Sequence, residues 1–280
     1  MNTVATFNAL GRNRHEFRSA TPLSDAQIRQ HAPSIFAAHP HDSRSERYAY
    51  IPTGDILQAL RREGFEAYQC GQSRTRDASK QDYTRHQLRL RHASQQLKAV
   101  NDETFEIVLL NSHDGSSSYQ MYAGALRLVC TNGLVVGRAI DAIKMPHKGQ
   151  VADRVIEGAF RVLDQMAPTQ ERIETMKAET LSEEEQHIFA QAALALRWEE
   201  GHEPVDAAQL NTAVRREDQG ADLWRSFNRV QENLVRGGQR GHTLQGRRTT
   251  TRPIIGIEQN VGLNRALWTL AEELQRLRAA

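Results

Sequence analysis

Hydrophobic residues recur at strand spacing in the first half of the chain and at helix spacing in the second half. Residues 65–72, 84–92 and 104–110 are predicted to be strands. The third of these is nearly continuous in apolar residues, which is typical of a strand that is buried on both faces. Shorter strands are predicted at residues 48–51 and 134–136.

Helix signals flank these strands. Ser24 is predicted to cap a helix within residues 23–36, and Thr53 is predicted to cap a helix that ends at Gly64. Residues 119–129 place their apolar side chains at helical spacing and predict a helix, although Gly124 within them also allows a strand.

The second half of the chain is predicted to be helical. Its helices are expected at residues 151–166 with an interruption at Pro168, 181–198 with a Ser182–Glu185 capping box, 207–216, 222–235 and 259–278. Residues 237–256 are rich in Gly, Thr and Arg and predict a mobile basic loop.

Together these elements predict an α+β protein. An α-β-β-β-α core with an antiparallel sheet, residues 45–148, is expected between an N-terminal extension with one helix, residues 1–44, and a helical C-terminal region, residues 149–280. The last helix carries a leucine seam that would pack within the chain or join a homo-oligomer. Its members are Leu263, Leu267, Leu270, Leu274 and Leu277.

Bulk composition excludes several classes of protein. The chain has 280 residues, enough for one large domain or two small ones. Its mean hydropathy is −0.62, and no apolar run approaches the ~18 residues of a membrane span. No signal peptide is apparent, and two cysteines make neither a disulfide framework nor a four-ligand zinc site. We therefore expect a cytoplasmic protein without membrane contact, cofactor or metal.

Charge is unevenly distributed along the chain. The net charge is only +2, yet residues 83–101 and 233–257 contain no acid, whereas acids concentrate in residues 171–222. Clustered arginines without acids favour a polyanionic partner.

Two arginine groups are the candidate nucleic-acid-binding residues. Along the strand at 84–92, Arg85, Arg89 and Arg91 would share one face at about 6.6–6.8 Å spacing, near the phosphate repeat of an extended nucleic-acid strand. A solvated or salt-bridged strand face is the alternative. The second group lies in the basic loop, for which a disordered linker is the alternative, and consists of Arg240, Arg247 and Arg248.

A polar block at residues 111–118 follows the third strand and allows a different chemistry. His113 and Asp114, with Cys130 further along the chain, could form a nucleophile system. The same block consists of turn-forming residues, and an apolar-flanked cysteine is more often an inert core thiol. We therefore predict no catalytic residue and expect the block to hold the corner after the strand. A metal site from His113, Asp114 and His147 is less favoured still.

Several separated blocks resemble a known family, domain of unknown function 932, whose members are encoded by phages, prophages and plasmids. The blocks are residues 50–53, His86 with residues 88–90, residues 111–117 and residues 126–134. The resemblance covers roughly residues 45–160. It implies mobile-element biology but no established activity, so it assigns no catalytic residues.

The order helix, three strands, helix also resembles the core of single-strand annealing recombinases, which bind single-stranded DNA along a basic groove and often form rings. We therefore expect a mobile-element nucleic-acid-binding protein, with single-stranded DNA in recombination or replication as the favoured partner. The alternatives are an enzyme with its site at Asn111–Gly115 and a protein-interaction factor that acts against host defence.

Overall fold

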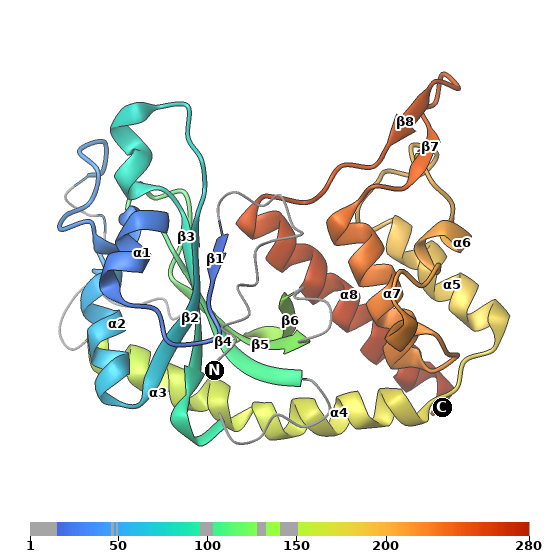
Figure 1. Cartoon of the computed structure of the whole chain (residues 1–280), viewed down its shortest axis with the longest axis horizontal. Helices are drawn as coiled ribbons and strands as arrows, with labels where there is room; N and C mark the ends of the chain where they lie inside the picture. Colours follow the sequence, from blue (N-terminus) through green and yellow to red (C-terminus); the bar gives the residue numbers. More distant parts are fainter. Residues whose placement is uncertain are drawn as a thin grey trace, which may run out of the picture. The chain divides into compact units, whose positions relative to one another are not determined.

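A computed structural model describes residues 16–45, 48, 50–95, 103–127, 133–140 and 151–279 of the chain (Figure 1). The chain divides into two compact units. One comprises Met1–Ala99, Glu106–Tyr122 and Ala139–Leu163, and the other comprises Val100–Phe105, Ala123–Arg138 and Asp164–Ala280. The predicted α+β class, with an antiparallel sheet and a helical C-terminal region, is confirmed.

Six strands form one sheet in the order in which they occur along the chain. They are β1 (Glu16–Arg18), β2 (Phe65–Gln72), β3 (His86–His92), β4 (Glu103–Asn111), β5 (Gln120–Arg127) and β6 (Gly133–Ile140). The first three pairings are antiparallel, with Cys70 opposite Leu88 and Leu88 opposite Leu109. These apolar partners lie on one face of the sheet, which helps explain why their side chains are completely buried.

The helices that accompany these strands are α1 (Asp25–His31), α2 (Thr53–Arg62) and α3 (Val151–Asp164). The 3₁₀ turns that accompany them are Pro33–Phe36, Ala78–Tyr83 and Ala93–Gln95. Ser24 caps α1 in a capping box with Gln27, as expected of an N-cap serine. Gly64 follows α2 with a φ of 86°, the left-handed conformation that ends helices at glycine.

Three local predictions in this region are wrong. Residues 119–129 were expected to be helical, but residues 120–127 form β5, because pairing within the sheet satisfies the backbone of a segment whose apolar spacing fits both periods. Residues 48–51 form no strand where they are described. Thr53 is the first residue of α2 rather than its cap, which is Pro52.

The C-terminal region contains α4 (Met166–Ala178), α5 (Glu183–Leu194), α6 (Ala207–Leu210), the 3₁₀ turn Arg216–Asp218, α7 (Leu223–Arg236), the hairpin β7 (Arg240–His242)–β8 (Arg248–Thr250) and α8 (Ile257–Arg278). Pro168 lies in the first turn of α4, where a proline costs no hydrogen bond. Phe227, Leu267 and Trp268 form the centre of this region's core. No described helix is both long and apolar enough to cross a membrane.

The leucine seam of α8 is only partly internal. Leu263 and Leu267 are buried, but Leu277 is 65% exposed. The buried stripe of α8 also includes Trp268 and Ala271. The internal packing face that was one of the two predictions for this helix is therefore present at its N-terminal half.

Candidate functional site

Residues 237–256, expected to be a mobile loop, contain the β7–β8 hairpin. Arg240 pairs with Thr250, Gly241 with Thr249 and His242 with Arg248. Because side chains alternate along a strand and cross-strand partners share a face, the two outer pairs point to one side of the ribbon and the central pair points to the other. We call the side with Arg240, His242, Arg248 and Thr250, all exposed, the basic face of the hairpin.

The opposite side of the ribbon lies on the loop before α6. The backbone N–H of His242 donates to the carbonyl of Pro204 at 2.9 Å. A Cβ atom on Gly241 would collide with that carbonyl oxygen and would lie 3.1 Å from Val205 Cγ1. Only glycine therefore allows this approach, and it holds the basic face outward.

The base of the hairpin is fastened to α7. Asn233 of α7 is buried, and its side-chain oxygen accepts a hydrogen bond from Gln239 Nε2 at 2.8 Å. The Thr251 hydroxyl donates to Gln239 Oε1 at 2.6 Å, and two backbone hydrogen bonds join Gly238 and Gln239 to Thr251. The hairpin is thus ordered before any ligand binds, which lowers the entropy that binding would cost.

Helix α7 is itself held by paired buried charges. The Glu232 carboxylate is 2% exposed and accepts from Arg215 at 2.9 Å and from Arg236 at 2.6 Å. Arg229 donates to the carbonyl oxygens of Asp218 and Gly220, each at 2.7 Å. Each buried charge has polar partners, as a stable interior requires.

The arginines of the sheet are in a different situation. Glu106 of β4 is completely buried, and its carboxylate accepts from Arg91 at 2.9 Å and pairs with Arg89 at 3.4 Å. The Arg91 guanidinium also lies 4.2 Å from the centre of the Tyr68 ring. Arg89 is only 3% exposed. Glu106 of the neighbouring strand therefore pairs with both Arg89 and Arg91, which is the salt-bridged alternative for this strand face.

Arg85, the third predicted contact on this strand, lies just before β3 and is half-buried. Its guanidinium donates to the carbonyl oxygen of Ser116, in the polar block that follows β4. Arg85 therefore differs from Arg89 and Arg91 both in its hydrogen-bond partner and in its exposure to solvent.

A buried polar corner links α2 to the ends of β3 and β4. Asn111 Nδ2 donates to Thr53 Oγ1 at 3.0 Å, and that hydroxyl lies 2.8 Å from His86 Nε2. His86 Nδ1 lies 3.0 Å from the carbonyl oxygen of Thr84, so it carries the proton and Nε2 accepts from Thr53. Complete burial lowers the pKa of His86 to about 3, which keeps the ring neutral.

His113 is buried beside His86. Its ring centre lies 4.9 Å from that of His86 and 5.0 Å from that of Tyr50. Neither ring nitrogen has a hydrogen-bond partner among the described residues, and burial lowers the pKa of His113 to about 4. A general base needs the proton it abstracts within reach, and the completely buried His113 ring forms no hydrogen bond with the Asp114 carboxylate. Cys130, the third residue of that alternative, lies outside the described residues.

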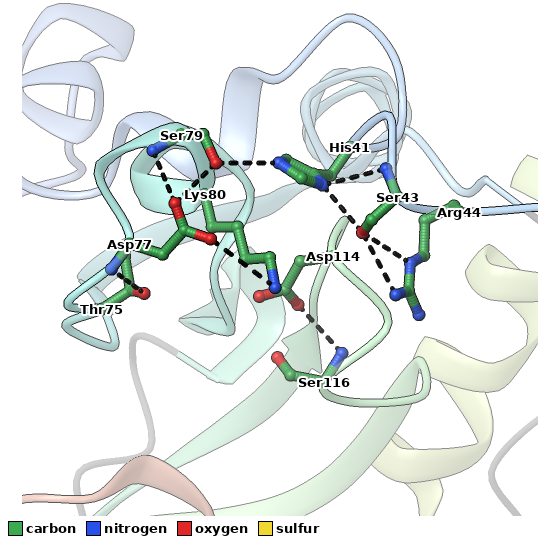
Figure 2. Close-up of polar contacts among 9 residues, drawn as sticks. All are labelled: His41, Ser43, Arg44, Thr75, Asp77, Ser79, Lys80, Asp114 and Ser116. Atoms are coloured by element: carbon green, nitrogen blue, oxygen red, sulfur yellow. Dashed lines mark hydrogen bonds and ion pairs between the residues drawn. The ribbon is translucent and has the colours of Figure 1, made fainter.

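Asp114 instead belongs to the surface of the corner. Its carboxylate accepts a hydrogen bond from the Ser116 N–H at 2.9 Å, and Figure 2 marks this contact with a dashed line. Nearby, His41 contacts Ser43 and Ser79, and Ser79 donates to Asp77. These hydrogen bonds lower the pKa of the Asp77 carboxyl. Lys80 Nζ lies 3.8 Å from the Asp77 carboxylate, and no three His, Cys, Asp or Glu side chains in the described part of the chain are grouped to hold a metal ion.

The fold is thus that of an α+β protein whose antiparallel sheet is accompanied by a helical region with a basic hairpin. The model of the family described as a domain of unknown function (DUF932) matches residues 40–268, and the chain belongs to this family. This confirms the resemblance in the sequence and extends it through most of the helical region.

Two relatives from Escherichia coli (strain K12) match nearly the whole chain. They are the UPF0380 proteins YfjQ and YafZ, each 44% identical over 257 residues, which is 92% of this chain and 93% of the relative. No solved structure matches the chain significantly.

Two residues that matter for these sites were not singled out in the sequence. Glu106 is an acid within an apolar run, and its spacing two residues from Val108 places it on the face that β3 fills with arginine. Gly241 lies in a segment dominated by Gly, Thr and Arg. The run of threonines at 249–251 is the strand signal that could have revealed the hairpin.

Proposed function

We propose that the protein binds nucleic acid through the basic face of the β7–β8 hairpin. The observation that carries this proposal is an exposed ribbon face with two arginines and a histidine in a segment, residues 233–257, that contains no acid. Arg247, in the turn between the strands, is exposed as well. Guanidinium groups suit phosphate because they donate two parallel hydrogen bonds.

The electrostatics of the hairpin support a phosphate ligand. Among the described residues, Arg240, Arg247 and Arg248 form no ion pair within the protein. Their like charges therefore repel one another until an anion binds, and phosphate contacts would release counterions to the solvent. The fastened base adds to this, because the arginines need little reorganisation on binding.

Single-stranded DNA annealing, in the recombination or replication of a mobile element, is the setting that the sequence predicts for this binding. Of the predicted contacts, Arg240, Arg247 and Arg248 are the ones whose exposure favours the proposal. Arg89 and Arg91 are paired with Glu106 and would have to break that pair first.

The test is fluorescence anisotropy with a labelled single strand and the matching duplex, between about 50 and 200 mM salt. A variant with Arg240→Gln, Arg247→Gln and Arg248→Gln should lose at least about tenfold in affinity. Its salt slope should fall by about 2–3, since each phosphate contact contributes roughly 0.7–0.9.

The matched control removes three other exposed arginines, with Arg161→Gln, Arg172→Gln and Arg276→Gln, whose side chains are 66%, 56% and 68% exposed. It changes the net charge equally and should keep the slope of the wild type. An equal loss in both variants, or no binding by the wild type at low salt, would overturn the proposal.

A further inference from the structure

The tip of the hairpin carries one apolar residue. Leu244 is 61% exposed, and it is the only residue in 237–252 with a large hydrocarbon side chain. The Gly246 N–H donates to the carbonyl of Thr243 at 2.8 Å, which places Leu244 at the second position of a four-residue turn.

The turn holds this side chain at the outermost point of the ribbon. Gly246 adopts a φ of 73°, and the Thr243 N–H donates to the carbonyl of Arg247 at 2.8 Å. The Thr243 hydroxyl accepts from the Arg247 N–H at 3.3 Å as well. An exposed leucine is thus presented on a defined turn, with Arg240 and Arg248 behind it on the basic face.

We propose that the β7–β8 hairpin is an arm that enters the minor groove of duplex DNA, where Leu244 inserts at a base step and bends the helix. This rests on the proposed function and names its substrate. Apolar side chains that wedge between base pairs kink a duplex by roughly 20–90°. The arginines of the basic face suit the minor groove of A·T-rich DNA, because its narrow width enhances the negative potential there.

Duplex DNA fits the hairpin better than a single strand does. Binding of single strands relies on aromatic side chains that stack on unpaired bases, and residues 237–256 contain no Phe, Tyr or Trp. Within a nucleic acid, a leucine side chain finds an apolar contact where two stacked base pairs can be separated. The ribbon supplies that leucine together with cations for the phosphates on either side.

The experiment measures bending separately from affinity. A duplex of about 30 base pairs, labelled at both ends for energy transfer and carrying 2-aminopurine at A·T steps, is titrated with the wild type and with Leu244→Ser. The wild type should raise both energy transfer and 2-aminopurine fluorescence. Leu244→Ser should bind within about threefold of the wild-type affinity, with the same salt slope, and lose both signals.

The control is Ile255→Ser, because Ile255 is 59% exposed but lies beyond the ribbon, and it should keep both signals. Signals unchanged in Leu244→Ser, or binding only to single strands, would overturn the bending arm and leave the proposed function standing. The bending arm would also be overturned if the protein did not bend DNA but bound anionic lipid vesicles with an affinity that depends on Leu244. Failure of the proposed function would be detected in a different experiment, the comparison of the triple arginine variant with its control across the salt series.

Discussion

The sheet and the hairpin use arginine in opposite ways. Arg89 and Arg91 lie on a sheet face where a buried carboxylate from the neighbouring strand meets both of them. Arg240 and Arg248 lie on a ribbon face that is open to solvent and has no acid nearby in the sequence. Both groups alternate along a strand, so the spacing of the arginines alone does not distinguish them.

The difference lies in the cross-strand partner. Register places Val108 opposite Arg89, with Glu106 two residues before it on the same face, whereas Thr250 and His242 stand opposite the two hairpin arginines. The arginines Arg89 and Arg91 are therefore paired within the protein, whereas Arg240 and Arg248 are exposed to solvent. The four predictions below test this contrast.

The largest expected effect is at Glu106. Glu106→Gln should lower the free energy of unfolding by about 3–5 kcal/mol, because it removes the buried carboxylate that pairs with both Arg89 and Arg91. Urea denaturation followed by circular dichroism measures this. The control Glu157→Gln breaks an exposed pair with Arg161 and should cost less than about 1 kcal/mol. A cost below that level at Glu106 would show that the buried pair is not what holds the sheet arginines.

Acid should weaken the sheet through its two buried histidines. The pKa values of His86 and His113 are lowered to about 3 and about 4, so between pH ~6.5 and ~4 the unfolded chain binds protons that the folded protein does not. Stability from these groups is present above pH ~6.5 and is lost as the pH falls, by roughly 1.4 kcal/mol per pH unit for each histidine.

Replacing one of the two rings should remove half of this slope. His113→Phe keeps the ring contacts with Tyr50 and His86 and should flatten the dependence of the free energy of unfolding on pH, measured in urea from neutral to mildly acidic solution. His202→Asn, which removes an exposed imidazole, serves as the control. If the free energy of unfolding depended on pH equally in both variants, His113 would bind its proton as readily in the folded protein as in the unfolded chain.

Gly241→Ala should displace the hairpin. The new Cβ atom collides with the carbonyl of Pro204, so the ribbon must shift, at a cost of about 1–3 kcal/mol. Trypsin should then cut faster at Arg247 and Arg248. Gly262→Ala in α8, where the added atom meets open space, should instead gain about 0.5–1 kcal/mol. Trypsin resistance equal to that of the wild type would argue against a ribbon held by glycine.

The smallest expected effect is on the stability of the hairpin variant. Removing Arg240, Arg247 and Arg248 together should change the free energy of unfolding by no more than about 0.5 kcal/mol, because these side chains are exposed. Arg91→Gln should cost several times as much, since it takes a donor from buried Glu106. Thermal melts of the two variants measure both effects. A lower melting temperature for the hairpin variant than for Arg91→Gln would contradict this prediction.

Local patterns predicted much of the fold. The strand at 65–72 and the capped helix starting after Ser182 were read correctly because their signals are contained within the segment. The segment at 119–129 was misread because its apolar residues fit a helix and a strand equally well, and pairing within the sheet decided between them. Thr53 was misread because its hydroxyl is engaged by His86 and Asn111, which are distant in sequence.

The residues of the candidate site were likewise predictable only where the signal lies within one segment. The acid-free stretch marked the hairpin arginines from composition alone. Nothing in a single strand showed that Glu106 would meet Arg89 and Arg91, because that depends on the register of β3 with β4. Register is a property of two paired strands. The sequence of β3 alone therefore could not show whether Glu106 or a ligand meets Arg89 and Arg91.

The backbone hydrogen bonds of Gly238 and Gln239 with Thr251 close the hairpin at its foot. Residues 240–250 lie beyond that closure, which holds the two ends of the segment together between α7 and α8. Lengthening a loop whose ends are already joined costs little additional entropy. The exposed tip at residues 244–246 should therefore tolerate a change of length better than residues 240–242, whose strand contacts Pro204.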